Sequence, residues 1–336
     1  MSLVSIIVPV YNGEKYLRAM LDSIIAQSNP AWECICVNDS STDGSLAILE
    51  EYSSRDPRIK CITKPNGGTG DSRNLGLDSA TGDFIMFADQ DDLLHPDAMK
   101  LALAAQLKTG ADVVQFNRCA FTDILKWKTI NENDAIKKVS PICEPLKSYL
   151  VTGKLVIYVW QYLYKKEALE NIRFPKLTGG EDSPFVFDLA NRTSNWVLLP
   201  VALYGFRENL SSVSRSIPIW YIENGFKACE LIYLHGRQYQ CDIELLTQRT
   251  TLDAFYFALS IVLRHGRGKR GMENMEAVSE KLSRTISNGT LALNNLSAWQ
   301  RVLVKELVAK RFFIPRAAAY TIGYLVSLVK WILARV

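Results

Sequence analysis

Short apolar runs alternate with amphipathic segments through the first 117 residues, and this alternation most constrains the fold. Leu3 to Val10 and Trp32 to Val37 read as buried strands, whereas Glu14 to Gln27 has apolar residues at helical spacing. The alternation continues through strands expected at 58–63, 83–88 and 112–117 and helices expected at 45–53, 71–80 and 96–108. Strands that alternate with helices form βαβ units. We therefore predict an α/β fold with a mostly parallel, Rossmann-like sheet flanked by helices.

The pattern changes beyond residue 117. Residues 121–145 read as an irregular stretch of mixed charge, a helix is expected to run to about Arg192 with Ser183 as N-cap and Pro184 at its first position, and 196–206 read as a last strand. A serine-rich segment follows at 207–216, and the signal from Ile217 onward is nearly all helical. We predict a sheet-containing domain at 1–216, in halves 1–117 and 118–216, and a helical C-terminal extension at 217–336.

The composition excludes several classes of protein. With 336 residues, 48% hydrophobic and 22% charged, the chain can bury a full core, and a net charge of +4 does not favour nucleic acid as a partner. Seven cysteines without a CxxC pair indicate free thiols in a reducing cytosol. The apolar start lacks a basic region before it and is read as a strand rather than a signal peptide.

Three carboxylates follow the expected strand at 83–88 within four residues: Asp89, Asp91 and Asp92. Like charges this close repel one another unless a hard divalent cation lies among them, which suggests a metal site. Turn chemistry or the N-cap of a helix opened by Pro96 is the alternative. Right-handed crossovers bring the loops after the first, second and fourth strands to one sheet edge, where Tyr11 and Asp39 would join this cluster.

Five segments in order resemble the inverting family-2 glycosyltransferases of the GT-A fold, over roughly the first 215 residues. The segments are Val4-Ser5-Ile6-Ile7-Val8-Pro9-Val10-Tyr11-Asn12, Val37-Asn38-Asp39-Ser40-Ser41-Thr42-Asp43-Gly44-Ser45, Asn66-Gly67-Gly68 with Arg73-Asn74-Gly76, Asp89-Gln90-Asp91-Asp92, and Gly180-Glu181-Asp182-Ser183-Pro184-Phe185. Any one alone is a weak signal, whereas five in the family's order are specific. The resemblance makes 1–117 the nucleotide-sugar half and 118–216 the acceptor and base half.

The resemblance implies a nucleotide-sugar site in the first half. Its residues would be Pro9, Tyr11, Glu14, Asp39, Gly68, Arg73, Asp89 and Gln90. Tyr11 would stack on the base, Asp39 would accept the imide N–H of uracil, which cytosine lacks, and Arg73 would contact the diphosphate or sugar. Simpler readings stay open, because Tyr11 could pack on the sheet edge and Asp39 could cap its own loop. This chain has Asp71-Ser72 before Arg73, where family members usually carry small residues.

The resemblance also implies a divalent metal and a catalytic base. Asp91, with Asp89 beside it, would hold Mg²⁺ or Mn²⁺, and Asp92 would support that site or cap a helix. Asp182 would deprotonate the acceptor hydroxyl as general base, with Glu181 orienting the loop or binding acceptor. Both carboxylates could instead stabilise a helix N-terminus. Arg207, or Arg215, would reach the phosphates.

The C-terminal extension is basic. From Arg264 to the end there are thirteen Lys and Arg against four Asp and Glu, a net charge of +9 that leaves −5 on the remainder. The apolar segment 317–334 is slightly short for a span and contains Lys330. We expect a helix lying on anionic lipid; burial in the domain or in a homodimer, and a true span, are the alternatives.

Taken together, the residues and the resemblance predict a metal-dependent, UDP-sugar-dependent inverting glycosyltransferase. It would move a hexose or N-acetylhexosamine to a hydroxyl of a glycan or lipid-linked oligosaccharide in bacterial surface-polysaccharide synthesis, in the cytoplasm at the inner face of the membrane. Two rivals remain. One is a nucleotidyltransferase making a nucleotide sugar, which Asn12-Gly13-Glu14-Lys15 fits poorly, and the other is a catalytically dead binding or scaffold subunit, which the presence of Asp91 and Asp182 disfavours.

Overall fold

The chain forms two compact units, Met1–Asn209 and Leu210–Val336. The computed structural model describes residues 2–152, 155–208, 219–265, 268–287, 289, 292–295 and 298–308. The domain boundary that we predict at residue 216 lies among residues 209–218, outside this set.

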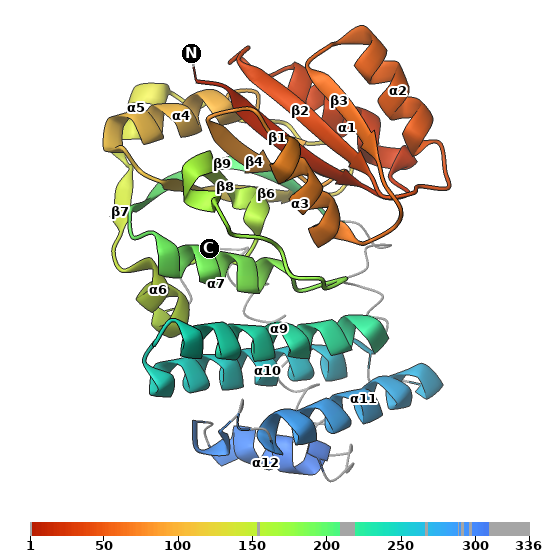
Figure 1. The fold of residues 1–336 in the computed structure, drawn as a ribbon, viewed down its shortest axis with the longest axis vertical. Helices are drawn as coiled ribbons and strands as arrows, with labels where there is room; N and C mark the ends of the chain where they lie inside the picture. The colour runs from red at the N-terminus through yellow and green to blue at the C-terminus, as the bar shows by residue number, and fades with distance from the viewer. Residues whose placement is uncertain are drawn as a thin grey trace. The chain divides into compact units, whose positions relative to one another are not determined.

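One sheet forms the centre of the first unit (Figure 1). Its strands are β1 (Val4–Val10), β2 (Trp32–Asn38), β3 (Ile59–Thr63), β4 (Phe84–Phe87), β5 (Leu93–Leu94), β6 (Val113–Phe121), β7 (Ser140–Ile142), β8 (Tyr162–Lys165) and β9 (Trp196–Arg207). Among the described residues they lie in the order β3-β2-β1-β4-β8-β6-β9-β5, with β7 also paired to β9. Strands β1 to β4 run parallel, as do β6 and β9. The α/β fold predicted from the alternation is confirmed.

Helices connect and flank these strands. They are α1 (Glu14–Ile25), α2 (Ser45–Arg55), α3 (Thr69–Ser79), α4 (Ala98–Thr109), α5 (Glu132–Lys137), α6 (Pro145–Lys147) and α7 (Asp182–Arg192), with single turns η1 (Ser148–Thr152), η2 (Val159–Gln161) and η3 (Lys166–Leu169). Every residue of β1 and β2 is buried, as expected for central parallel strands with both faces covered. Gly76 lets α3 approach β1 closely, because a Cβ there would lie 2.3 Å from Cγ2 of Ile7.

Pro9 occupies a position in β1 that tolerates a missing N–H. Strand β4 pairs with β1 only as far as Ile7, so beyond that point β1 has a partner strand on one side alone. Proline is tolerated where a strand lacks one neighbour, because no ladder hydrogen bond is lost. The pairing of β1 with β4 ends at Ile7, and the predicted site residues follow at this edge of the sheet.

The second half of the unit differs from the sequence prediction. Strand β8 runs antiparallel between β4 and β6 and was not predicted, because four residues are too few to show a period. The stretch predicted to be irregular contains α5 and β7. The prediction of Ser183 as N-cap is wrong: Glu181 is the N-cap and α7 begins at Asp182, whose carboxylate therefore lies in the first helical turn.

The second unit is helical in its described residues. It contains α9 (Ile219–Gln238), α10 (Ile243–His265), α11 (Gly268–Ser287) and α12 (Ala298–Val308), with a short turn η4 (Leu293–Asn295). Apolar side chains such as Phe226, Leu246 and Leu282 are buried within it, and Arg249 pairs with Asp253 at 2.8 Å. No described helix has the length and apolarity that crossing a membrane requires. The apolar segment at 317–334 lies outside the described residues.

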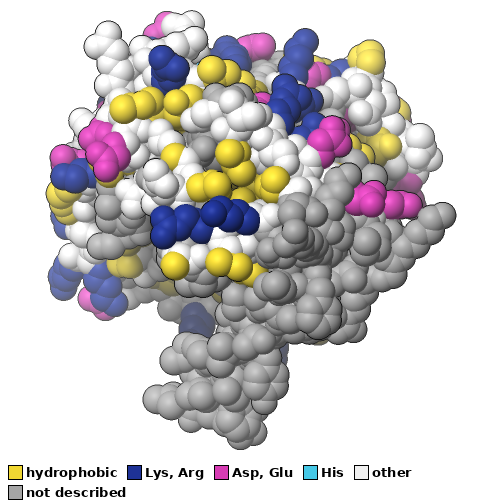
Figure 2. Space-filling view, turned by 90° about the horizontal axis from the view of Figure 1, so that it is seen from below, with side chains coloured by type: hydrophobic (Ala, Val, Ile, Leu, Met, Phe, Trp, Pro, Cys, Tyr) yellow, Lys and Arg dark blue, Asp and Glu magenta, His cyan; other side chains and the backbone are white. Residues whose placement is uncertain are grey.

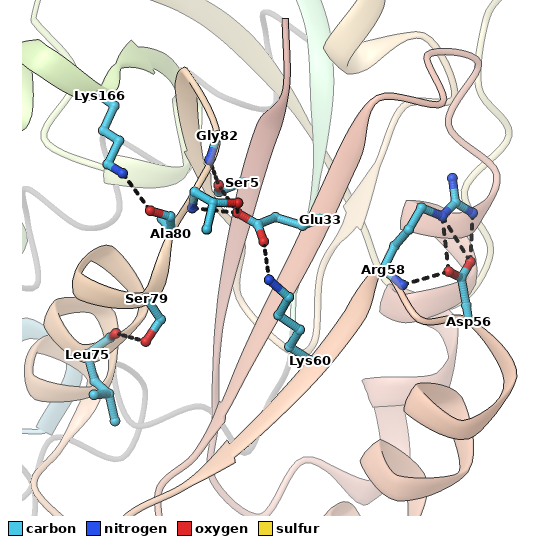
Figure 3. A network of polar contacts seen from close by, with 11 residues as sticks. Ser5, Glu33, Asp56, Arg58, Lys60, Leu75, Ser79, Ala80, Gly82 and Lys166 are labelled. Atoms are coloured by element: carbon cyan, nitrogen blue, oxygen red, sulfur yellow. Dashed lines mark hydrogen bonds and ion pairs between the residues drawn. The ribbon is translucent and has the colours of Figure 1, made fainter.

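A buried glutamate ties the sheet together at the edge opposite the predicted site (Figure 3). The Oε1 atom of Glu33 accepts hydrogen bonds from the Ser5 hydroxyl (2.6 Å) and from the backbone N–H (2.6 Å) and hydroxyl (2.8 Å) of Thr81. Its Oε2 atom accepts from the Lys60 ammonium at 2.7 Å. Burial alone would raise the pKa of Glu33, but these hydrogen bonds lower it to about 2. The carboxylate therefore joins β1, β2, β3 and the loop before β4.

Replacing this carboxylate by an amide tests the network. Because the folded-state pKa is lowered, the stabilisation is complete above about pH 4.5 and is lost as the pH falls toward 2. We expect Glu33→Gln to reduce the free energy of unfolding at pH 7 by on the order of 3 kcal/mol, and this difference to shrink between pH 6 and pH 3. Urea unfolding across that range measures it. Glu144→Gln, at an exposed ion pair, is the control and should change little; a pH-independent difference would contradict the assignment.

Candidate active site

The loops after β1 and β4 are joined by one side chain. The Gln90 amide accepts a hydrogen bond from the backbone N–H of Tyr11 and donates one to its carbonyl oxygen, both at 2.9 Å. Gly13 leaves room for this contact, because a Cβ there would lie 2.3 Å from Oε1 of Gln90. Gln90 thereby fixes the backbone of Tyr11, whose side chain is 49% exposed. An exposed ring on a fixed backbone suits stacking on a base, and that role of Tyr11 stays a prediction.

Glu14 lies at a junction of two helix N-termini. Its Oε2 atom accepts from the N–H of Gly44, which precedes α2, at 2.9 Å. In return, Asp43 accepts from the N–H of Glu14 at 3.0 Å. Carboxylates satisfy the unpaired N–H groups of a first helical turn. The contacts described for Glu14 are thus structural, and its part in nucleotide-sugar binding stays a prediction.

Asp39 organises the glycine-rich loop before α3. Its Oδ1 accepts from the N–H of Gly67 and its Oδ2 from the N–H of Gly68, both at 2.8 Å. The ammonium of Lys64 lies 2.6 Å from Oδ1 and 2.7 Å from the carboxylate of Asp71. Gly68 has φ of 88°, which favours glycine. The described contacts of the carboxylate are with the glycine-rich loop and Lys64 rather than with its own loop, and its recognition of uracil stays a prediction.

Arg73 is the electrostatic centre of the site. It projects from α3, is 3% exposed, and its guanidinium contacts Asp182 at 2.7 Å, Asp89 at 2.9 Å and Glu181 at 3.1 Å. Its Cζ also lies 5.3 Å from the centroid of the Phe174 ring. Burial would lower the pKa of Arg73, but the three carboxylates raise it, so the cation is permanent. Among the described residues its Nε has no hydrogen-bond partner.

The two carboxylates at the start of α7 have raised pKa values. Burial raises the pKa of Asp182 to about 7; the Arg73 guanidinium lowers it, while Glu181 and Asp89 raise it. Burial also raises the pKa of Glu181. A carboxyl with pKa near 7 can accept and return a proton near neutral pH, which is the property of a general base. The position of Asp182 beside Arg73 is consistent with the predicted role, which stays a prediction.

The acidic cluster divides between two environments. Asp89 faces Arg73, whereas Asp92 is buried and accepts from the Tyr204 hydroxyl (2.8 Å) and the backbone N–H of Arg207 (2.7 Å). The Tyr204 hydroxyl also accepts from the N–H of Asp89 at 2.9 Å. Burial and the neighbouring carboxylates raise the pKa of Asp92. The alternative that Asp92 caps the next helix is wrong, because Asp97 is the N-cap of α4.

Arg207 supports the acidic loop instead of projecting toward a ligand. Its guanidinium donates to the carbonyl oxygens of Asp91 (2.7 Å) and Thr122 (3.0 Å) and lies over the rings of Tyr16 and Phe121. Only 8% of the residue is exposed. These contacts argue against the predicted phosphate contact. Arg215 lies outside the described residues.

The predicted metal site can be compared with this arrangement. Within the described part of the chain, no three His, Cys, Asp or Glu side chains are placed to share an ion. Arg73 donates to Oδ1 of Asp89, and no described donor contacts Oδ2 of that carboxylate. Asp91 follows two residues later in the same loop. One or two carboxylates together with ligand phosphates are the usual protein set for Mg²⁺. Asp89 and Asp91 fit a site of two carboxylates and ligand phosphates, whereas the described residues form no site of three carboxylates.

Three contributors were missed by the sequence prediction. Tyr204 binds the acidic loop from β9, more than 100 residues away in the chain, and nothing local signals this contact. The N–H of Val159 hydrogen-bonds the carboxylate of Asp182, again from a segment with no motif. Lys64 could have been found, because it directly follows β3 at the edge where the other strand ends meet.

The fold and this site define a GT-A transferase of nucleotide sugars, and sequence comparison gives the family. The sequence profile described as glycosyl transferase family 2 matches residues 5–173. The chain belongs to glycosyl transferase family 2. It is 34% identical over 221 residues to the uncharacterized glycosyltransferase EpsJ of Bacillus subtilis (strain 168), and the alignment covers 63% of each chain.

Solved structures share the fold. The S. aureus TarS 1-349 crystal structure in complex with UDP-GlcNAc matches 96% of this chain and 92% of its own, with a TM-score of 0.70 and 20% identity. The mannosyltransferase PcManGT of Pyrobaculum calidifontis, in complex with GDP-Man and Mn2+, matches 94% and 86% with a TM-score of 0.50 and 17% identity. At these identities the likeness establishes the GT-A fold, as the sequence predicted.

Removal of the central cation tests how far the site depends on it. Arg73→Gln leaves three carboxylates without their shared partner, two of them largely buried. We expect a loss of about 3–5 kcal/mol in the free energy of unfolding, measured with urea at pH 7.5, and a smaller loss at pH 5, where the carboxylates can protonate. Arg173→Gln, at an exposed pair with Asp78, is the control and should cost about 1 kcal/mol or less. Equal losses in both variants would refute the central role of Arg73.

Proposed function

We propose that this chain is an inverting glycosyltransferase that moves a hexose or N-acetylhexosamine from a UDP-sugar to a hydroxyl of a glycan or lipid-linked oligosaccharide. The observation that carries the proposal is the contact of Arg73 with Asp182 and Asp89. It places the candidate base and the candidate donor-binding carboxylate on one buried cation. The UDP-GlcNAc bound to TarS supports a UDP-sugar donor, and the setting in surface-polysaccharide synthesis follows from the family resemblance.

The chemistry follows from the positions of the side chains. Asp182 takes the proton of the acceptor hydroxyl, the acceptor oxygen bonds to the anomeric carbon from the face opposite the leaving group, and the bond to the diphosphate breaks. Inversion results from this single displacement. Arg73 orients Asp182 and stabilises its ionised form, and its unpartnered Nε is a donor for an oxygen of the sugar or diphosphate. Tyr11 and Asp39 bind the base in this scheme.

A divalent metal completes the proposed site. Asp91 and Asp89 would hold Mg²⁺ or Mn²⁺, which would offset the negative charge that develops on the departing diphosphate. The Mn2+ in PcManGT supports this assignment. Tyr204 and Arg207 keep the acidic loop in place from β9.

We further propose that the protein is cytoplasmic and works at the inner membrane face through its C-terminal region. The net charge of +9 beyond residue 263 supports attraction to anionic lipid. Figure 2 shows a face of the molecule on which Lys and Arg side chains lie next to hydrophobic ones. On α12, Val302 is 51% exposed and Lys305 is also exposed. Both kinds of side chain contribute to binding at a lipid surface.

The base assignment predicts a rate loss and a pH dependence. We expect Asp182→Asn to lower UDP release from a UDP-sugar roughly 10²–10⁴-fold. Wild-type kcat/KM should rise as the pH increases through about 7, because Asp182 must lose its proton to act, and the residual rate of the variant should lack this rise. A panel of UDP-sugars measured from pH 5 to pH 9 checks both. Asp78→Asn, at an exposed position, is the control and should behave like wild type. Substantial turnover by Asp182→Asn would contradict the assignment of Asp182 as the general base.

The metal assignment predicts dependence on a divalent ion. Chelation with EDTA should abolish UDP release, and Mn²⁺ or Mg²⁺ should restore it. Asp91→Asn should raise the metal concentration needed for half-maximal rate by about tenfold or more, while Asp97→Asn, beyond the acidic loop, should not. An undiminished rate in EDTA would remove the metal from the proposal and leave the role of Asp182 to be judged separately.

A further inference from the structure

A stack of aromatic rings contains Tyr158, Trp160 and Phe206, which take no part in the scheme above, and Tyr204, which also holds the acidic loop. Trp160 stacks on Tyr158 (ring centroids 5.1 Å apart), on Tyr204 (4.3 Å) and on Phe206 (5.7 Å), with interplanar angles of 20° or less. Trp160 and Tyr204 are buried, whereas Tyr158, at the end of the stack, is 40% exposed. One face of the Tyr158 ring is therefore covered by Trp160, and the side chain still presents a large surface to solvent.

An exposed arginine is held against this stack. The Cζ atom of Arg118, on β6, lies 4.9 Å from the ring centroids of Tyr158 and Phe206 and 5.4 Å from that of Trp160. Arg118 is exposed, and no described carboxylate forms an ion pair with it. Contacts with three ring systems restrict the guanidinium without neutralising its charge. Arg118 is thus a preorganised cation available to an anion.

The stack is connected directly to the base. The N–H of Val159 donates to the carboxylate of Asp182, and the carbonyl oxygen of Val159 accepts from the Tyr164 hydroxyl at 2.8 Å. Tyr158 precedes Val159, so the exposed ring belongs to the residue adjacent to the one that contacts the base. An acceptor whose hydroxyl reaches Asp182 would therefore lie within reach of the Tyr158 ring.

We propose that Tyr158 and Arg118 form the acceptor subsite, and that it takes a sugar carrying a negatively charged group near the accepting hydroxyl. The inference rests on the proposed function of Asp182 as base. A sugar ring presents an apolar face of C–H groups that packs on an aromatic side chain, while the tyrosine hydroxyl stays solvated. The guanidinium binds a phosphate or carboxylate through paired hydrogen bonds.

Charge balance supports an anionic acceptor. The centre of the site holds Asp89, Glu181 and Asp182 around a single arginine, so an unassisted anion would be repelled from it. Arg118, held against the aromatic stack, supplies a positive charge that no described carboxylate pairs with. The arrangement separates the reacting hydroxyl, which goes to Asp182, from the charged group, which goes to Arg118.

Binding of matched probes to the full chain saturated with UDP and Mn²⁺ tests the proposal. The probes are methyl glucopyranoside, glucose 6-phosphate and glucuronate, with dissociation constants measured by ligand-observed NMR. We expect at least one anionic probe to bind about tenfold more tightly than the neutral one. The anionic probe with the lower dissociation constant shows whether phosphate or carboxylate is preferred. Arg118→Gln should abolish this preference, and Tyr158→Leu should weaken all three probes by a similar factor.

Controls separate the acceptor subsite from the donor site and from folding. UDP affinity, measured first, should be the same in wild type, Arg118→Gln and Tyr158→Leu, and Arg192→Gln, a surface variant, should keep the anion preference. Equal binding of neutral and anionic probes by wild type, or an anion preference that survives Arg118→Gln, would overturn the proposal. A loss of UDP affinity in either variant would overturn it too. Failure of the wild type to bind UDP would instead refute the proposed function.

Discussion

The site depends on one buried cation shared by three carboxylates. Arg73 comes from α3, Asp89 from the loop after β4, and Glu181 and Asp182 from the start of α7, so a single guanidinium joins segments more than 100 residues apart. Three negative charges cannot be packed this closely without a compensating cation. The same pairing sets the protonation of Asp182, because burial raises its pKa and the arginine limits that rise. Architecture and reactivity therefore rest on the same contact.

Much of the first half could be predicted from sequence because its signals are local. Apolar runs and helical spacing located β1 to β4 and α1 to α4, and parallel strands bring their carboxyl ends to one edge. Tyr11, Asp39 and the acidic loop meet there for that reason. The sequence could not show which hydrogen-bond partners these side chains have: Asp39 holds the glycine-rich loop and Asp92 is buried against β9. Such assignments depend on neighbours that are distant in the chain.

The second half was less predictable for the same physical reason. Strand β8 is four residues long and pairs antiparallel with β4 on one side and β6 on the other, so its position is set by tertiary pairing and not by its own pattern. The stack of Tyr158, Trp160, Tyr204 and Phe206 is drawn from two segments that show no shared motif. In both cases the information lies in which surfaces fit together, and a single sequence does not display that.

The contacts from β9 to the acidic loop bear on how enzymes of this kind can be recombined. Tyr204 and Arg207 hold the backbone and side chains of Asp89, Asp91 and Asp92, although they lie beyond residue 173, where the family profile ends. The nucleotide half is consequently not a self-sufficient module. A chimaera that joined residues 1–117 to the second half of a relative would inherit an acidic loop shaped by foreign side chains. Exchange of acceptor halves should succeed only between relatives that present an equivalent hydroxyl and guanidinium from the last strand.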